Sequence, residues 1–293
     1  MRHVLIGIFV LATLVVSAVA RAQSTISDRP YEVLVGNGMW VSALPDYELG
    51  TSGNGTTAIR DSLDDVGYYG DIKAIRRFLG TRTSFEARGF YGYSGSRSTF
   101  DNSDIDLPNP VDGASNVFSG GSSRFSSDTD HYGYDIGLRD TWRTKFGGIS
   151  GAALFSFMAF DQTFDLDYGG SRLMSEELNS DYIGGKGVFG WDGLVYGRPS
   201  TLDIAIGFYQ LRADYRFEGG SISGFRSNRM YKNPVTVEAI FSRYHACRGY
   251  QVGVTAAATY LSEMPKIEHH QGSSVSLGSD DGFLFRLMFE ILL

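Results

Sequence analysis

The last thirteen residues, 281–293, alternate regularly between two kinds of side chain. Every second residue from Phe283 to Leu293 is large and apolar, whereas the positions between them include Arg286 and Glu290. Because successive side chains of a β-strand point to opposite faces, one face of this segment is hydrocarbon and the other carries an arginine and a glutamate. The pattern predicts a strand that separates an apolar environment from a polar one. Both membrane-spanning and soluble strands meet that description.

The other end of the chain indicates export. Arg2 and His3 precede an apolar run, 4–16, which is followed by small residues ending at Ala22. These are the three parts of a secretory signal, so we expect cleavage after residue 22 and a single mature domain over 23–293. The apolar run is too short for a retained spanning helix. A lipoprotein is not expected either, because no cysteine lies near the cleavage site. The only cysteine, Cys247, rules out a disulfide framework.

Beyond residue 22 no apolar stretch reaches the roughly 18 residues that a transmembrane helix needs. A mature chain in a membrane must therefore form a closed barrel, because lipid offers no hydrogen-bond partner to the open edge of a sheet. With 37 glycines, 17 tyrosines, 20 phenylalanines and only 20% charged residues, the composition suits short alternating spans with aromatic belts. A large secreted β-sandwich stays open as the alternative.

Alternation bounded by turn-forming residues predicts about ten strands. They lie near 31–44, 66–78, 83–95, 131–143, 149–163, 182–197, 201–217, 233–244, 250–261 and 281–293. The first is interrupted by 36–38, Gly-Asn-Gly, and the fifth is apolar on both faces. Counts of eight or twelve therefore remain open.

The connections between these strands alternate in length. Four are short: 79–82, 144–148, 198–200 and 245–249. The other five are long and polar: 45–65, 96–130, 164–181, 218–232 and 262–280. The fold predicted is an all-β, antiparallel transmembrane β-barrel with short periplasmic turns and long extracellular loops. We expect loop 96–130, rich in Ser, Asp, Asn and Gly, to be mobile, and 171–178 to form a short helix or a loop turn.

Charge excludes one class of partner. Without the signal the chain keeps 24 basic and 33 acidic residues, a net charge of −9, with much of the acidic excess in the long loops, including Glu176 and Glu177. Nucleic acid needs a basic footprint, so it is not expected as a partner. An acidic rim is a solvated surface or a site that shares divalent cations with anionic lipid head groups.

The strand faces opposite the apolar rows carry a nearly balanced set of charges. These lumen-lining candidates are Asp71, Lys73, Arg77, Glu86, Arg88, Asp135, Arg139, Arg143, Lys186, Asp203, Glu238, Arg286 and Glu290. Such charges either pair across the bore and fill it or line a narrow aqueous path. A ten-stranded bore is too narrow for a wide general porin, since eight strands are just filled by side chains.

Candidate catalytic residues are few. Asp130 beside His131 could orient an imidazole as a general base, as acid and histidine residues do at the barrel mouth of the omptin proteases. No second aspartate pair at a matching strand tip and no flanking similarity accompany them, and no serine–histidine pair suited to a lipid hydrolase assembles on the lipid-facing wall. His269 and His270 are adjacent, so their side chains point apart and suit solvated loop positions better than one metal. We expect no enzyme activity, no metal and no cofactor.

Over its mature length the chain resembles Gram-negative outer-membrane β-barrel proteins, through its signal, its C-terminal strand and its unequal connections. It ends in Leu293 where most of them end in Phe. The segment 181–211, a Gly-rich strand, an Arg-Pro-Ser turn and an apolar return strand, resembles the Legionella-type major outer-membrane, pore-forming family. The resemblance implies location in the bacterial outer membrane. It also implies contact with outer-membrane lipid and lipopolysaccharide, recognition by the barrel-assembly machinery, and passage of small solutes or ions.

Three functions follow as hypotheses. The first is a porin-like narrow pore or a structural barrel, in which the lumen charges set ion passage or plug the bore. The second is a surface adhesin or ligand-binding barrel that acts through loop 96–130. The third is an enzyme at the barrel mouth that uses Asp130 or His131.

Overall fold

The computed structural model describes residues 30–52, 57–61, 64–145, 147–247 and 250–293, so the predicted signal peptide, 1–22, lies outside the described residues. The described chain forms thirteen strands. They are β1 (Tyr31–Ala43), β2 (Tyr47–Ser52), β3 (Thr57–Asp61), β4 (Asp64–Arg77), β5 (Thr83–Pro108), β6 (Ser115–Thr144), β7 (Gly147–Tyr168), β8 (Ser171–Val195), β9 (Arg198–Gly219), β10 (Phe225–Lys232), β11 (Val235–Cys247), β12 (Tyr250–His270) and β13 (Ser273–Leu292). Within these residues no helix is long and apolar enough to cross a membrane.

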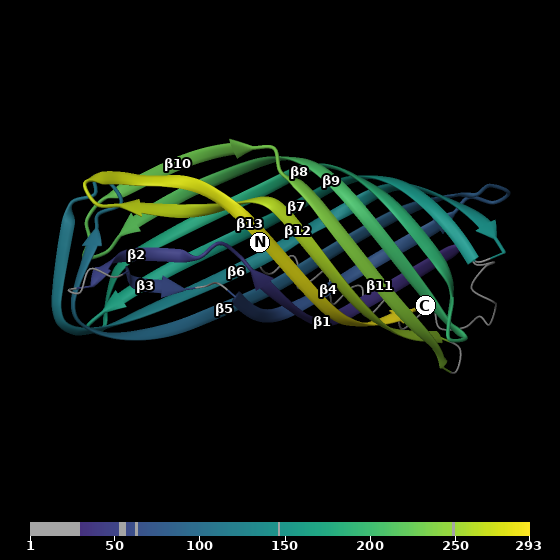
Figure 1. Cartoon of the computed structure of the whole chain (residues 1–293), viewed down its shortest axis with the longest axis horizontal. Helices are drawn as coiled ribbons and strands as arrows, with labels where there is room; N and C mark the ends of the chain where they lie inside the picture. The colour runs from purple at the N-terminus through teal and green to yellow at the C-terminus, as the bar shows by residue number, and fades with distance from the viewer. Residues whose placement is uncertain (1–29, 53–56, 62–63, 146, 248–249) are drawn as a thin grey trace.

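Ten of these strands close into a barrel (Figure 1). The ring runs β1-β4-β5-β6-β7-β8-β9-β11-β12-β13, every neighbouring pair is antiparallel, and β1 returns to β13 over Leu34↔Leu292 to Ala43↔Phe283. Closure leaves no unpaired edge in this part of the molecule, which is the condition for a sheet to cross a membrane. The prediction of an antiparallel transmembrane barrel with ten strands is confirmed.

Large apolar side chains cover the outside of the ring, as strand alternation requires. Every ring strand contributes to this collar, which includes Met39, Tyr68, Phe85, Leu138, Phe155, Phe189, Ile206, Phe208, Phe241, Val254, Phe285 and Phe289. Phe208 is 67% exposed and Phe289 is 70% exposed, values that mark a lipid-facing surface in a closed barrel. The collar therefore defines the membrane-spanning part of the protein.

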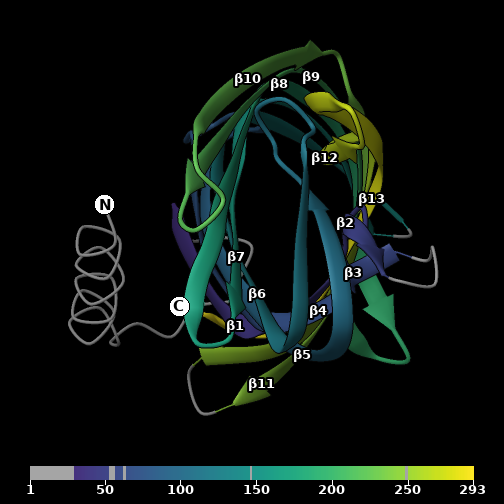
Figure 2. The same ribbon diagram turned by 90° about the vertical axis from the view of Figure 1, so that its left-hand side faces the viewer.

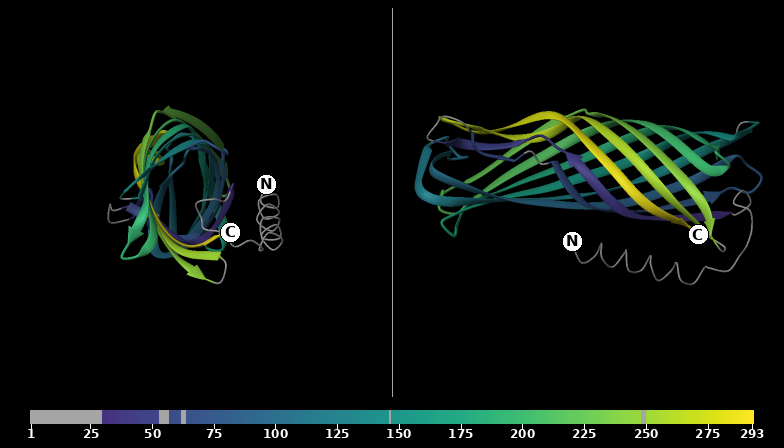
Figure 3. Two further views of the ribbon diagram at one scale, coloured as in Figure 1. Left: turned by 90° about the vertical axis from the view of Figure 1, so that its right-hand side faces the viewer. Right: turned by 60° about the horizontal axis from the view of Figure 1, so that its bottom comes forward.

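The two ends of the barrel differ. At one end, here named the turn end, short connections join β4 to β5, β6 to β7, β8 to β9 and β11 to β12. Strand β1 begins at this end and strand β13 ends at it (Figure 3). At the other end, the hairpin end, β5 to β9, β12 and β13 extend well beyond the collar (Figure 1). The predicted short turns and the asymmetry of the connections match this arrangement.

The long connections are not loops, and here the sequence prediction was wrong. Segment 96–130, expected to be mobile, is the outer half of β5 and β6, which pair from Thr83↔Asp140 to Pro108↔Ser115. Segment 171–178 is the start of β8 and not a helix. Segment 45–65 contains β2 and β3, and 218–232 contains β10, which continues into β11 past Pro234. Together these extensions form a head on the barrel.

The head has a hydrophobic core of its own. Rings of Tyr47, Phe125 and Phe164 stack with centroids 4.7–6.3 Å apart, and all three side chains are buried. The hairpin tips touch one another: the Gly272 N–H donates to Gly113 O, and the Asn109 side-chain amide donates to Ser223 O. Figure 2 shows these tips gathered at the hairpin end. Ordered strands and mutual contacts make the head a folded unit.

Glycines in the ring make room for close neighbours. A Cβ on Gly38 would lie 2.0 Å from the Leu287 carbonyl oxygen of β13, so the Gly-Asn-Gly stretch that breaks the pattern of β1 permits closure of the barrel there. A Cβ on Gly190 would lie within 2.5 Å of polar atoms of Asp203, Ser150 and Arg139. Gly190 therefore clears space for charged side chains in the bore.

Candidate functional site: a filled bore

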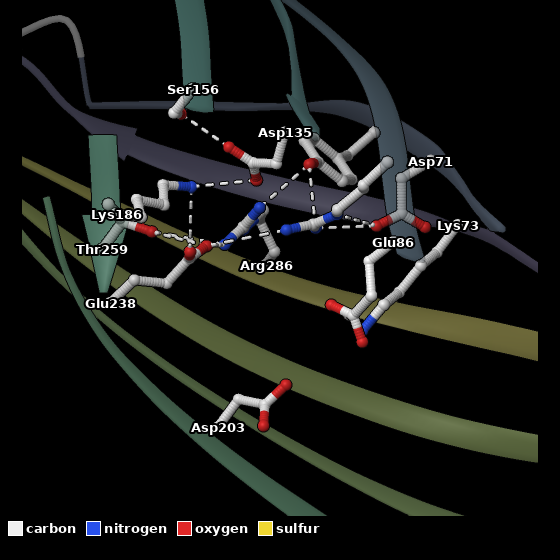
Figure 4. A network of polar contacts seen from close by, with 12 residues as sticks. Asp71, Lys73, Glu86, Asp135, Ser156, Lys186, Asp203, Glu238, Thr259 and Arg286 are labelled. Atoms are coloured by element: carbon white, nitrogen blue, oxygen red, sulfur yellow. Dashed lines mark hydrogen bonds and ion pairs between the residues drawn. The ribbon is translucent and has the colours of Figure 1, made fainter. Parts of the chain in front are cut away.

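The centre of the bore is built around one carboxylate, that of Glu238 on β11 (Figure 4). Arg286 of β13 donates to it, Lys186 of β8 lies 3.3 Å from its Oε2, and Arg88 of β5 lies 3.8 Å from its Oε1. Arg88 also makes two hydrogen bonds to Asp71 of β4, at 2.7 and 2.9 Å. Strands on opposite sides of the barrel are thus joined across its interior.

Lys186 extends this network to the wall formed by β6 and β7. Its Nζ donates to Asp135 at 3.0 Å, Ser156 donates to the other Asp135 oxygen at 2.5 Å, and Tyr209 donates to Ser156 at 2.9 Å. Lys186 is about 10% exposed and Asp135 about 6%. Each buried charge therefore has a charged partner and further hydrogen bonds, the condition under which buried ions are tolerated.

A second cluster lies on the side of the turn end. Arg139 of β6 donates two hydrogen bonds of 3.0 Å to Asp203 of β9, and its Nε lies 2.7 Å from Glu86 of β5. Lys73 of β4 lies 3.6 Å from Glu86. A paired guanidinium and carboxylate in this fork geometry is among the stronger ionic contacts in proteins.

The structure brings together ten of the sequence-predicted lumen residues. Five acids and five bases form the two clusters: Asp71, Lys73, Glu86, Arg88, Asp135, Arg139, Lys186, Asp203, Glu238 and Arg286. Glu290 lies apart and accepts a hydrogen bond of 2.8 Å from Tyr244. Arg143 is exposed at the turn end, and Arg77 pairs with Glu32 at 2.9 Å. The charges in the clusters cancel, so the bore has little net charge of its own.

A layer of aromatic side chains covers the network on the side of the head. One ring comes from each of seven successive ring strands: Trp40, Tyr69, Phe90, His131, Phe160, Tyr182 and Tyr209. Neighbouring rings lie 4.2–6.3 Å apart, with His131 stacked between Trp40 and Phe160. Tyr69 accepts a hydrogen bond of 2.9 Å from Arg286, so layer and network touch. We call this layer the aromatic seal.

The turn end, in contrast, is hollow. A cavity of about 900 Å³ opens there and is bounded inward by Lys73, Glu86, Arg139 and Asp203 of the network. A separate void of about 40 Å³ inside the network shares the same four residues. We call the larger space the vestibule. It reaches the ion pairs from one side only, because the aromatic seal lies beyond them.

A third polar cluster is buried in the head. The Glu176 carboxylate of β8, which is fully buried, accepts hydrogen bonds from Tyr47 of β2 at 2.6 Å and Tyr215 of β9 at 2.5 Å. His269 Nε2 of β12 lies 3.0 and 3.1 Å from its two oxygens, and His269 Nδ1 lies 2.9 Å from the Glu48 carbonyl oxygen. Both ring nitrogens face acceptors, so the geometry requires an imidazolium. We call these four side chains the head latch.

Opposite charge maintains both ions of the head latch. Burial alone would lower the pKa of His269, but the adjoining Glu176 carboxylate raises it above its usual value. Burial would raise the pKa of Glu176, but His269 and the two tyrosine hydroxyls lower it. Burial and the same carboxylate raise the pKa of Tyr47 and Tyr215, which stay neutral donors. The latch therefore joins four strands through one ion pair.

Sequence reasoning missed the head latch. Glu176 was assigned to an acidic rim and His269 to a solvated loop, but the side chains are 0% and 2% exposed. The prediction that His269 and His270 point apart is confirmed, since His270 is exposed. The sequence signal was weak: Leu261, Met264 and Ile267 are buried near His269, but a register shift between Leu261 and Met264 breaks the alternation that would have indicated a continuing strand.

Asp130 and His131 do not form the dyad considered from sequence. They lie on opposite faces of β6: the hydroxyl of Tyr91 donates to Asp130, whereas His131 is 3% exposed within the aromatic seal. The His131 ring nitrogen Nδ1 lies 3.2 Å from the Ala159 carbonyl oxygen. Because the imidazole packs between two rings, it has no access to a substrate held by Asp130. Among the described residues no group of three or more potential ligands is placed to hold a metal ion.

Comparison with known proteins identifies the type of barrel. No protein-family model matches the chain, and no curated protein matches its sequence. Among solved structures, the outer membrane protease OmpT from Escherichia coli is similar over 93% of this chain and 99% of that one, with a TM-score of 0.52 and 8% sequence identity.

Two structures of one protein, TodX, are less similar. The toluene transporter TodX from P. putida has a TM-score of 0.25 and 8% identity, covering 90% of each chain. A deltaS2S3 mutant of the TodX monoaromatic hydrocarbon channel has a TM-score of 0.31 and 9% identity, covering 89% of this chain and 68% of that one. At these identities only the similarity to OmpT supports a conclusion, and that conclusion is the fold: a barrel of the outer-membrane type.

Proposed function

We propose that this protein is an outer-membrane barrel whose bore is closed, and that it serves as a structural or binding barrel and not as an open porin. The turn end lies in the periplasm and the head lies outside the cell, surrounded at its base by lipopolysaccharide. One observation carries the proposal: the ion-pair network and the aromatic seal occupy the bore at two successive levels. The porin-like function expected from the lumen charges is thereby replaced by their alternative role, plugging.

The network suits closure better than conduction. An ion that entered would have to displace Arg286 or Lys186 from Glu238, which is itself about 7% exposed. It would then meet the seal, where His131 and Phe160 rings lie 4.2 Å apart. Moving an ion through such an apolar layer is costly because nothing replaces its hydration shell. The bore thus presents a polar plug and an apolar plug in series.

Osmotic swelling of proteoliposomes tests closure. Vesicles that contain the refolded chain should swell in small sugars no faster than empty vesicles. His131→Ala combined with Phe160→Ala removes two rings of the aromatic seal and should increase swelling. Phe155→Ala, on the lipid-facing side of the same β7, is the matched control and should leave swelling unchanged. Rapid swelling with the wild-type chain would overturn the proposal.

Surface binding is the second candidate function. The hairpin tips contact one another through Gly113, which lies in the segment expected to be mobile, and through Gly272 and Ser223. A preformed surface binds with a smaller entropic cost than a flexible loop. Deletion of 96–130 would remove Ile105, Leu107 and Phe125 from the head core, so it would disturb folding as well as binding. A better variant is Val117→Lys, since Val117 is 65% exposed on β6.

The binding candidate is tested on a panel of glycans and immobilised matrix proteins. Vesicles that display the wild-type head should be retained by one member of the panel. Val117→Lys should reduce that retention, whereas Leu79→Lys, an exposed residue at the turn end, should not. Retention that both substitutions reduce equally would argue against binding through the head.

A further inference from the structure

The vestibule at the turn end has the size of a small-molecule site. Its volume of about 900 Å³ falls within the range of roughly 300–1,000 Å³ typical of ligand pockets. It is lined by residues next to three turns: those between β4 and β5, between β6 and β7, and between β8 and β9. Figure 3 shows the barrel from this end. A concave space bounded by three fixed turns is a better candidate than any exposed patch on the head.

Ion pairing leaves an excess of positive charge in the vestibule. Its lining holds five bases and four acids, and Lys73, Arg77 and Arg139 neutralise the three acids Glu32, Glu86 and Asp203. The two bases left over, at the mouth, are the exposed Arg82 and Arg143; the fourth acid, Asp192, is also exposed there, so the lining keeps a net charge of +1. Neither guanidinium has an ion-pair or side-chain hydrogen-bond partner within the part of the chain that the structure describes. They are available to an incoming anion.

Basic side chains also lie elsewhere at the turn end. Bases lie at three of the described turns of this end: Arg82, Lys145 and Arg198. The protein as a whole has a net charge of −7, so positive charge is concentrated at this end against the overall balance. An excess of one sign of charge around a concave site raises the local concentration of small ions of opposite sign.

The wall chemistry restricts the ligand further. The side chains of Ser84 and Ser150 also line the space. Guanidinium groups bind carboxylate and phosphate oxygens through paired hydrogen bonds, and hydroxyl groups donate to the same oxygens. This combination suits a small molecule that carries two or more anionic groups.

We propose that the vestibule binds a small polyanion, with carboxylate or phosphate groups held by Arg82 and Arg143. The side from which the ligand arrives, the periplasm, rests on the orientation given under Proposed function. The binding itself does not depend on whether the bore conducts. Currents through the barrel would therefore contradict the closed bore and leave this proposal standing, whereas absence of binding would contradict only this one.

Fluorescence anisotropy of pyranine, a pyrene trisulfonate, measures binding to the full-length mature chain in detergent, where both ends of the barrel are accessible. Wild-type protein should bind the dye saturably. Arg82→Ser with Arg143→Ser should weaken binding at least tenfold. The control, Arg76→Ser with Arg198→Ser, removes the same charge from bases that do not line the vestibule and should change affinity less than twofold. Unaltered heat-modifiable gel mobility shows that each variant is folded.

Competition identifies the anionic group. Displacement of the dye by citrate indicates carboxylate recognition, displacement by inorganic pyrophosphate indicates phosphate recognition, and either supports the site. Three results would overturn it: no saturable binding to the wild-type chain, equal weakening by the two double variants, or dye that neither competitor displaces. Equal weakening would mean attraction to the general charge of the turn end, and dye resistant to both competitors would mean simple adhesion to aromatic rings.

Discussion

The bore and the head both bury charge, but they do so in different ways. In the bore, Glu238 is shared by Arg88, Lys186 and Arg286, and two of these bases have a second carboxylate partner in Asp71 or Asp135. In the head, Glu176 and His269 have no other ionic partner among the described residues. The network in the bore has redundancy, and a neighbouring void gives room for water. The head latch has neither, so the same kind of substitution should cost more there.

Loss of His269 should therefore have the largest effect. His269→Leu leaves the Glu176 carboxylate buried with two tyrosine donors and no cation, and breaking a buried pair in this way typically costs about 3–5 kcal/mol. Equilibrium urea unfolding of the vesicle-inserted protein, followed by protease sensitivity of the head, measures it. His270→Leu, an exposed neighbour, is the control and should stay within about 0.5 kcal/mol. If the two substitutions lowered the unfolding free energy equally, the head latch would not be what stabilises the head.

A second substitution should restore part of the stability lost in His269→Leu. Glu176→Leu added to His269→Leu removes the buried charge and leaves only apolar groups and the two tyrosines. The double variant should be more stable than His269→Leu alone, because replacing a whole ion pair costs less than orphaning one partner. A double variant less stable than the single one would show that the loss comes from packing and not from charge.

Glu238→Gln tests the redundancy of the bore. Arg88 and Lys186 keep their contacts with Asp71 and Asp135, so the expected loss is about 1–3 kcal/mol, smaller than that of His269→Leu. The same urea titration, followed by the mobility of heated and unheated samples, gives the value. A loss that exceeds that of His269→Leu would reverse the ranking of the two regions.

Alkaline pH should lower the stability of the head and leave that of the bore unchanged. The raised pKa of His269 means that its contribution is complete below the ordinary histidine value of about 6.5 and disappears as pH rises through the raised folded value. The lowered pKa of Glu176 means that its contribution is present above its ordinary value and disappears as pH falls through the lowered one. The latch is thus strongest between these limits.

Hydrogen–deuterium exchange measures this pH effect. Once corrected for intrinsic exchange rates, protection of residues 264–279 should fall as pH rises above the ordinary histidine range, while that of β13 in the collar stays constant. His269→Gln, which cannot titrate, should show low protection at every pH. Protection of 264–279 that is independent of pH in the wild-type chain would contradict an imidazolium at this position.

The smallest expected effects distinguish two arginines that sequence alone treated as equivalent. Arg139 holds Asp203 and Glu86, whereas Arg143, two residues further along β6, is exposed at the vestibule mouth. Arg143→Ser should change the unfolding free energy by less than about 0.5 kcal/mol, and Arg139→Ser should cost distinctly more. Comparable costs would place Arg143 in the network.

Alternation along the strands carried most of the fold prediction. It located all ten ring strands, because one face of each meets lipid and the pattern there is strict, as in β9 from Leu202 to Phe208. It failed in the head, where the outer faces of β5 and β6 are wetted and rich in Ser and Asp, so that an ordered strand has the composition of a loop. Leu173 and Met174 at the start of β8 are both buried because a register shift there leaves Leu173 as an extra residue, and two adjacent apolar residues suggested a helical spacing.

The site was predictable in part. Alternation gives the face of each residue, and it placed Asp71, Glu238 and Arg286 inward together. It cannot give the relative slide of neighbouring strands, which decides that Arg139 meets Asp203 on β9, 64 residues away in sequence. It also cannot give contacts made across the barrel, such as those of His269 with β2 and β8.

Single-channel conductance of the refolded mature chain in a planar bilayer is the most direct test of the closed bore. The wild-type chain should insert, as heat-modifiable mobility would show, and give no discrete current steps. Removal of the aromatic seal by His131→Ala with Phe160→Ala should produce steps, and Phe155→Ala should not. Stable discrete steps from the wild-type chain at ordinary voltages would contradict the central claim that its network and seal close the bore.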